Sequence, residues 1–183
     1  SNRAFIYKTD DGGESWYEVY DSLSLGVLNS AVFIDGVNGI AVGNNGNALY
    51  SYDAGESWIT SNISPVNLYS VSFYDNLNGL ISGANGLFYK TTDGGISWNT
   101  VISRNYKNFY SVKFKDNYFA AASGEGGTIL LSHNGGFDWT QEQRITNNDL
   151  YSIGLTNDFR IFAFGEYGTV IYSNMNKLKM TSD

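Results

Sequence analysis

The stretch Thr91-Thr92-Asp93-Gly94-Gly95-Ile96-Ser97-Trp98 recurs three more times in the chain in similar form. The other copies, which we group with it as the octets, are Thr9-Asp10-Asp11-Gly12-Gly13-Glu14-Ser15-Trp16, Ser51-Tyr52-Asp53-Ala54-Gly55-Glu56-Ser57-Trp58 and Ser132-His133-Asn134-Gly135-Gly136-Phe137-Asp138-Trp139. Their final tryptophans lie 42, 40 and 41 residues apart, and the chain contains no other tryptophan. A near-constant spacing of this kind indicates a repeated structural unit.

Two further features keep the same spacing. One is a pair of glycines that encloses two residues, at 43–46, 83–86, 124–127 and 165–168. The other is a segment of alternating residues at 68–73, 109–114 and 150–155, with a weaker copy at 28–33. Such alternation predicts β-strands. The repeat is therefore a whole structural unit and more than a recurring turn.

Each unit divides into four short strands separated by residues that favour turns. In the unit that holds Asp93, we expect strands at about 68–74, 79–83, 87–92 and 97–102, with Asn, Asp and Gly between them. No segment shows helical periodicity longer than one turn. Four antiparallel strands within one such repeat are typical of a β-propeller blade. The sequence therefore predicts one all-β domain over residues 1–183, a β-propeller of four-stranded antiparallel blades.

The positions of these features predict the blades. We expect a partial blade at 4–24, whole blades at 28–64, 68–104 and 109–144, and a partial blade at 150–175. A fifth octet would begin at Ser173, but residues 174–177 contain neither glycine nor tryptophan, so the series is expected to stop there. This gives 17 strands, one more than a ring of four blades needs. We therefore expect part of a larger or multi-chain ring, completed by self-association or by additional blades from a parent chain.

The octets resemble the Asp-box, or bacterial neuraminidase repeat, whose pattern is S/T-x-D-x-G-x-S/T-W. Nearly the whole chain resembles the photosystem II stability/assembly factor-like Asp-box β-propellers. We expect each octet to form the hairpin between third and fourth strands, its acid bonding the turn backbone and its Trp packing between blades. The expected structural residues are Asp11, Trp16, Asp53, Trp58, Asp93, Trp98, Asn134 and Trp139. The spacing of a calcium-binding EF-hand loop is absent, so no metal is expected.

The composition argues against several functions. The chain has 18 acidic and 11 basic residues, a net charge of −7 and no basic run, so nucleic acid is not an expected partner. No apolar stretch reaches the roughly 18 residues of a membrane span, so membrane insertion is not expected. The absence of cysteine and the single histidine, His133, argue against thiol catalysis, a Ser-His-Asp triad and multi-histidine metal sites. No cofactor is expected.

The turns of a four-stranded meander alternate between two faces. The octets and the first turns then share one face, and the glycine pairs and the linkers between blades share the other. Because the octets serve the fold, we expect recognition on the second face. Its candidate binding residues are Tyr69, Tyr110, Tyr151, Arg104, Arg144, Glu125, Glu166 and Tyr167. Tyrosine and arginine are typical contact residues, and packing between blades is the alternative role for the three tyrosines spaced 41 residues apart.

These features favour a non-catalytic module that binds a protein or a glycan, or that forms a structural part of a secreted or cell-surface protein. The family resemblance implies a second possibility, an assembly factor of a photosystem-type complex. A sialidase-like glycoside hydrolase is less favoured, because such sites need converging arginines and only Arg104 and Arg144 share the candidate face. The use of similar repeats in exported bacterial proteins implies an extracellular, cell-surface or periplasmic location.

Overall fold

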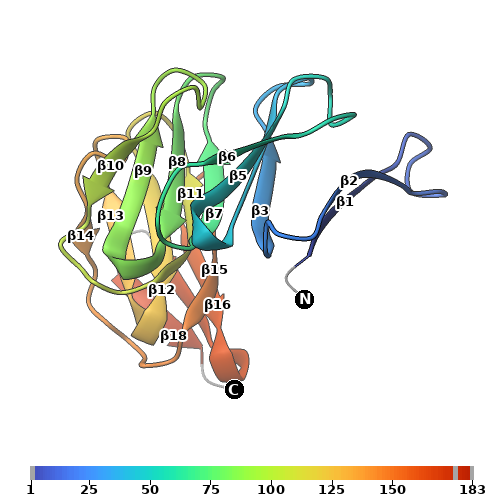
Figure 1. The fold of residues 1–183 in the computed structure, drawn as a ribbon. Helices are drawn as coiled ribbons and strands as arrows, with labels where there is room; N and C mark the ends of the chain where they lie inside the picture. Colours follow the sequence, from blue (N-terminus) through green and yellow to red (C-terminus); the bar gives the residue numbers. More distant parts are fainter. Residues whose placement is uncertain (1–2, 175–176, 182–183) are drawn as a thin grey trace. The chain divides into compact units, whose positions relative to one another are not determined.

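The computed structural model describes residues 3–174 and 177–181, and this part of the chain is built from β-strands and four single-turn 3-10 helices. The strands form four four-stranded antiparallel sheets and one two-stranded sheet (Figure 1). Within every sheet the strands follow chain order, so each sheet is a meander. The chain divides into two compact units, residues 1–68 and 69–183, and each is described by itself.

The first unit contains a two-stranded sheet and a four-stranded sheet. Its strands are β1 (Ala4–Lys8), β2 (Tyr17–Ser22), β3 (Leu28–Phe33), β4 (Gly39–Gly43), β5 (Asn47–Ser51) and β6 (Ile59–Asn62). Ala4 of β1 packs with Leu25, Ala41 and Leu49 in a buried cluster, and Trp58 contacts this cluster. The apolar core of this unit therefore joins its two sheets.

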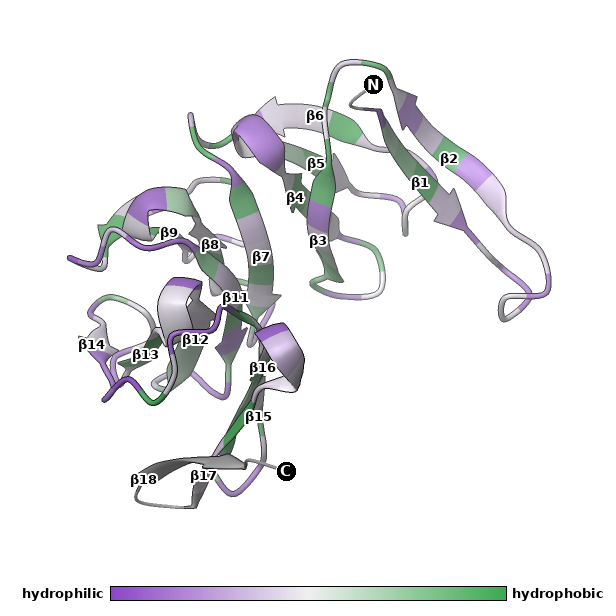
Figure 2. Ribbon diagram, turned by 90° about the horizontal axis from the view of Figure 1, so that it is seen from below, coloured by the Kyte–Doolittle hydropathy of each residue, from purple (hydrophilic) through white to green (hydrophobic). Residues whose placement is uncertain are grey.

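The second unit contains three four-stranded sheets, and its first strand begins at the boundary. The strands are β7 (Leu68–Phe73), β8 (Gly79–Gly83), β9 (Leu87–Thr91), β10 (Asn99–Ile102), β11 (Phe109–Phe114), β12 (Ala120–Gly124), β13 (Ile129–Ser132), β14 (Thr140–Gln141), β15 (Leu150–Leu155), β16 (Ile161–Gly165), β17 (Val170–Asn174) and β18 (Lys177–Thr181). Hydrophobic residues gather on the strands, while the connecting turns are mostly hydrophilic (Figure 2).

The sheets of the second unit pack face to face. Leu80 and Phe88 of one sheet form a buried cluster with Ala120 and Ala122 of the next sheet. Ala121, which points to the other side of β12, belongs to a separate cluster with residues of β15, β16 and β17. Because β12 is buried on both faces, it is built from small residues, three alanines followed by Ser123 and Gly124, and large polar side chains do not alternate with apolar ones. The sheet of β11–β14 thus contributes one face to each of two cores, as a propeller blade does.

The predicted strand positions agree with the structure to within two residues in the blade that holds Asp93. The largest difference is that β10 begins at Asn99, because Ser97 and Trp98 belong to the octet turn. Among the described residues, none forms a helix with the length and apolar character of a membrane-spanning segment.

The prediction of 17 strands was wrong, because 18 strands lie within the described residues. The additional strand, β18, pairs with β17 from Asn174↔Lys177 to Val170↔Thr181, although no octet connects the two strands. Backbone pairing needs only an antiparallel return of the chain, so the loss of the octet did not signal the loss of the strand. The predicted end of this last blade, residue 175, lies outside the described residues.

Candidate binding face

The turns of each blade are tied to one another at two separate ends. At the end that we call the octet end, octet amides donate to carbonyls of the first turn of the same blade; the bonds are Ala54–Val37 (2.9 Å), Gly94–Leu77 (2.9 Å) and Gly135–Tyr118 (2.7 Å). At the other end, the linker end, glycine-pair turns bond to residues between blades; the bonds are Asn44–Val27, Glu125–Asn108 and Glu166–Asp149, all 2.9 Å. The predicted separation of the turns into two faces is confirmed.

In the first three octets, the carboxylate of the aspartate accepts hydrogen bonds from residues of its own turn. In the octet of Asp93, one carboxylate oxygen accepts the Ser97 amide at 3.0 Å and the Thr91 hydroxyl at 2.7 Å. The other oxygen accepts the Ser97 hydroxyl at 2.6 Å. These hydrogen bonds, first those from Ser97, lower the pKa of Asp93 to about 2. Asp11 and Asp53 make the same set of bonds, and their pKa values are also lowered, chiefly by Ser15 and Ser57.

The fourth octet keeps this turn with its polar groups exchanged. The Asn134 carbonyl oxygen accepts the Asp138 amide at 2.9 Å, and the Asn134 side-chain amide donates to the Asp138 carboxylate at 2.8 Å. The negative charge of these two positions is on Asp138, whereas in the other octets it is on the residue equivalent to Asn134. The hydrogen bonds between these two positions are kept. Among the described residues, no three acidic or histidine side chains gather as a group that could hold a metal ion.

The four octet tryptophans do not all occupy the same environment. Trp139 stacks on Phe88 of the neighbouring blade with ring centroids 4.4 Å apart, as predicted for packing between blades. Trp58 packs edge-on against Phe33 of its own blade and also contacts the cluster that includes Ala4. Trp98 packs edge-on against Phe73 of its own blade. Trp16 differs from the others because it is 61% exposed.

In the blade of β11–β14, close approaches of backbone at the linker end require both glycines of the pair. A Cβ on Gly124 would lie 2.0 Å from the Asn108 carbonyl oxygen, and one on Gly127 would lie 2.1 Å from that of Thr146. Gly127 also has a φ of +72°, a conformation that side chains rarely adopt. Gly124 therefore lets the linker before its own blade lie close against the turn, and Gly127 does the same for the linker before the next blade.

The sequence analysis missed a polar residue that stands directly before the first strand of three blades and hydrogen-bonds to the glycine-pair turn before it. Asn67, Asn108 and Asp149 lie 41 residues apart, and each accepts a backbone amide from the preceding glycine-pair turn. The Asp149 carboxylate accepts the Gly126 amide at 2.7 Å with one oxygen and the Tyr110 hydroxyl at 3.2 Å with the other. Its constant spacing is the signal that could have revealed this position.

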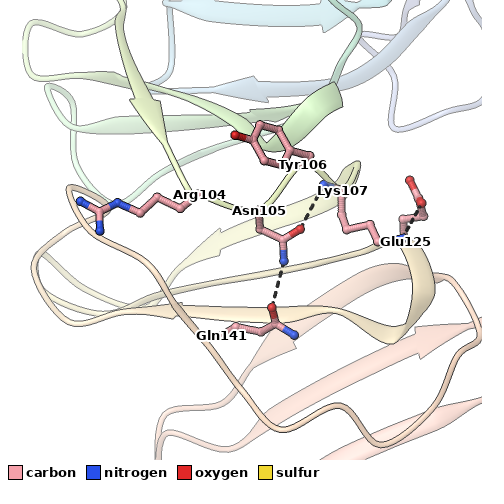
Figure 3. A pocket seen from close by; sticks show the side chains of 6 residues that line it. All are labelled: Arg104, Asn105, Tyr106, Lys107, Glu125 and Gln141. Atoms are coloured by element: carbon pink, nitrogen blue, oxygen red, sulfur yellow. Dashed lines mark hydrogen bonds and ion pairs between the residues drawn. The ribbon is translucent and has the colours of Figure 1, made fainter.

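A cavity of about 500 Å³ opens at the linker end of the second unit (Figure 3). It is lined by Arg104, Asn105, Tyr106, Lys107, Glu125 and Gln141. Polar bonds fix its lining: the Asn105 amide donates to Gln141 at 3.0 Å, and Lys107 pairs with Glu125 at 2.9 Å. Arg104 and Tyr106 are exposed, and Figure 3 shows their side chains pointing away from these bonds. The structure thus brings together Arg104 and Glu125, two of the predicted binding residues.

Three further predicted residues, Tyr69, Tyr110 and Tyr151, form a row. The centroids of the Tyr69 and Tyr110 rings are 5.3 Å apart, and those of Tyr110 and Tyr151 are 5.4 Å apart. Tyr69 and Tyr110 are partly buried, whereas Tyr151 is 53% exposed. Burial and the neighbouring Asp149 raise the pKa of Tyr110 to about 12, so its hydroxyl stays protonated at neutral pH. The row thus combines packing between blades with exposure at the Tyr151 end.

The remaining predicted residues lie apart from the cavity. Glu166 accepts the Tyr151 hydroxyl at 3.1 Å, and its neighbour Tyr167 is 92% exposed. Arg144 is exposed, but it does not line the cavity. His133 lies at the octet end against Phe119, with ring centroids 5.2 Å apart.

Comparison with solved structures shows which fold this arrangement belongs to. No protein-family model and no curated protein sequence matches the chain. YCF48 bound to a D1 peptide is similar over 88% of this chain and 55% of that chain, with a TM-score of 0.71 and 19% identity. The chain therefore spans little more than half the length of this YCF48.

Two other solved structures share the architecture. The WD40 β-propeller domain of Doa1 is similar over 86% of this chain and 55% of that one, with a TM-score of 0.68 and 16% identity. An ancestral GH74 enzyme is similar over 96% of this chain and 28% of its own, with a TM-score of 0.75 and 18% identity. At such identities the likeness concerns the fold alone. The face-to-face meanders and these neighbours together identify the chain as a β-propeller module of four-stranded antiparallel blades.

Proposed function

We propose that the chain is a non-catalytic β-propeller module that binds a protein partner through the linker end of its blades. The observation that carries this proposal is the cavity at 104–107. There the exposed side chains of Arg104 and Tyr106 lie beside the side-chain amides of Asn105 and Gln141, which are hydrogen-bonded to each other. Such residues supply much of the binding energy at protein interfaces. A YCF48 with the same fold has been solved with a peptide bound, which supports a peptide segment as the kind of ligand.

The backbone at Arg104 also supports a binding role. Its φ is +59°, although arginine gains nothing from a left-handed conformation. Ser103 holds the linker in this shape, because its hydroxyl donates to the Gly86 carbonyl at 2.8 Å and accepts the Asn105 amide at 3.2 Å. A strained residue that its surroundings hold in place is typical of functional sites. The fold therefore fixes the position from which the Arg104 side chain extends.

The carboxylate at this cavity is engaged in binding its neighbours, which favours recognition over hydrolysis. Glu125 pairs with Lys107 and also accepts the Asn108 amide at 3.4 Å. Arg104 is the single arginine in the cavity lining, whereas a sialidase-like site needs several to clamp its substrate. The likeness to a GH74 enzyme covers the fold and carries no activity with it.

Reversing the charge of Arg104 is expected to reduce capture of the partner. The tagged chain is incubated with an extract of its source organism, and bound proteins are quantified by mass spectrometry for wild type, Arg104→Glu and Arg160→Glu. Arg160 is the matched control because it is exposed and lies in a first turn, at the octet end. We expect Arg104→Glu to weaken capture of a specific partner by about tenfold, a typical contribution of an interface arginine. Equal capture by the two variants would exclude the proposed face.

We propose further that the octets are Asp-boxes and that the chain is related to assembly-factor propellers. The bonding of Asp11, Asp53 and Asp93 within their own turns supports the first point. The similarity to YCF48 supports the second. Export to the cell surface or periplasm stays a prediction.

A further inference from the structure

The exposed end of the tyrosine row carries two aromatic rings and two carboxylates. Tyr151 lies on β15, and Tyr167 lies in the glycine-pair turn η4 (Glu166–Gly168) that follows β16. The Tyr151 hydroxyl donates to Glu166 at 3.1 Å, and Glu166 in turn accepts the backbone amide of Asp149 at 3.2 Å. These bonds place Tyr151, Glu166 and Asp149 together on the linker end.

Tyr151 and Tyr167 both lie at irregular positions of the backbone, and both are exposed. Leu150 pairs with Gly165 and Ser152 pairs with Phe164, so Tyr151 is the extra residue of a β-bulge. A bulge turns a side chain away from the direction that the regular strand would give it. The same bulge occurs at Tyr110, whose ring is partly buried and lies between those of Tyr69 and Tyr151, whereas more than half of the Tyr151 surface is exposed.

Tyr167 occupies a position that suits other residues better. Its φ is +54°, and the equivalent residues of the other three turns are Asn45, Asn85 and Gly126, which are the types that tolerate this conformation. The Tyr167 ring nevertheless stands almost fully in solvent. The fold therefore gains nothing from a tyrosine here, and the ring is available to a ligand.

The two carboxylates beside these rings carry uncompensated charge. Within the described residues, neither Asp149 nor Glu166 forms an ion pair with a lysine or arginine, whereas Glu125 of the preceding turn pairs with Lys107 at 2.9 Å. The whole chain has a net charge of −7, which adds to the negative potential of this surface. A positively charged group is the complementary occupant.

We infer that Tyr151, Tyr167, Glu166 and Asp149 bind an arginine or lysine side chain of the partner protein. The aromatic faces attract a cation through their quadrupole, and the carboxylates supply the opposite charge. This inference rests on the proposed function, and it adds the chemistry of the segment that is recognised, which carries a basic side chain. The basic side chain would bind at the linker end beside Tyr151, apart from the cavity at Arg104.

The test uses a fluorescein-labelled octapeptide of alternating glycine and arginine, with an alternating glycine–glutamine octapeptide as the neutral control. Binding is measured by fluorescence anisotropy at low salt and at physiological salt. Tyr167→Asn and Glu166→Gln are each expected to weaken binding of the arginine peptide by about fivefold or more. Glu14→Gln removes the same charge from an exposed position in the first octet and is expected to leave the affinity within about twofold of wild type.

Tyr167→Asn keeps this test independent of folding. Because asparagine occupies this turn position in two other blades, the variant is expected to unfold at the same or a higher denaturant concentration than wild type. A loss of binding with unchanged stability supports the inference. Equal binding of the arginine and glutamine peptides overturns it, as does an equal loss of binding in Glu14→Gln. Labelled cellohexaose serves as a glycan probe, and its binding at Tyr151 and Tyr167 in place of the arginine peptide also overturns the inference.

The inference and the proposed function fail in different ways. If partner capture depends on Arg104 but is unchanged in Glu166→Gln and Tyr167→Asn, the cation site is wrong and the binding face stands. If capture is unaffected by Arg104→Glu while the arginine peptide still binds at Tyr167, the cavity at Arg104 does not bind the partner. The site for a basic side chain at Tyr151 and Tyr167 is then still supported.

Discussion

Gly127→Ala will lower the free energy of unfolding by more than about 3 kcal/mol, whereas Gly126→Ala will lower it by about 1 kcal/mol. The two glycines are neighbours in one turn, with φ values of +72° and +63°. Both variants therefore incur the same backbone cost. They differ because a Cβ on Gly127 would lie 2.1 Å from the Thr146 carbonyl oxygen, while one on Gly126 finds its nearest neighbour, the Lys107 amine, at 3.9 Å.

Urea unfolding followed by circular dichroism measures this difference. The midpoint of Gly127→Ala should fall well below that of Gly126→Ala at a similar slope. A Gly127→Ala chain that does not fold at all would agree with the expectation, provided that Gly126→Ala folds. Equal midpoints for the two variants would show that the linker does not press on the glycine-pair turn, and the description of the linker end would be wrong.

Asp93→Ala is expected to cost about 1–2 kcal/mol, because it removes the acceptor of three hydrogen bonds at a partly exposed turn. Asp93→Asn is expected to recover part of this loss. Its side-chain oxygen can still accept the Ser97 amide, as Asn134 accepts the Asp138 amide in the fourth octet. The measurement is again urea unfolding at neutral pH. An alanine variant as stable as wild type would contradict a stapling role for the octets.

The same residue should make stability depend on pH. Because the pKa of Asp93 is lowered to about 2 in the folded chain, its contribution is complete above the ordinary aspartate pKa of roughly 3.9. The contribution is then lost as the pH falls from about 4 to about 2. The difference in unfolding free energy between wild type and Asp93→Asn should therefore shrink over this range. A difference that stays constant would show that the carboxylate charge has no part in the turn.

Much of the architecture could be predicted because its determinants are local. An octet contains both the donors and the acceptor of its own turn, so its sequence is sufficient to specify the structure. The glycine pairs and the alternating segments likewise report backbone requirements directly. The separation of the turns into an octet end and a linker end followed from counting turns along a meander.

Other features depended on contacts between distant residues. The sequence around Lys90 on β9 does not show that its side chain is buried; it donates to the Gly135 carbonyl of the next blade at 2.7 Å and lies near the ring of Phe137. Burial lowers the pKa of Lys90, which fits a long side chain used to tie two blades together. The cavity at 104–107 depends in the same way on the path of a linker. No local pattern encodes either feature.

We assign recognition of a partner to the linker end and maintenance of the fold to the octet end. Site-specific photocrosslinking tests this assignment, with the photoreactive residue p-benzoylphenylalanine placed in turn at exposed tyrosines of both ends. Tyr106 and Tyr167 represent the linker end, and Tyr52 and Tyr118 represent the octet end. The measurement is the yield of a defined adduct in an extract of the source organism. We expect a specific adduct from Tyr106 or Tyr167 and none from Tyr52 or Tyr118. A specific adduct from Tyr52 or Tyr118 alone would show that the partner binds at the octet end.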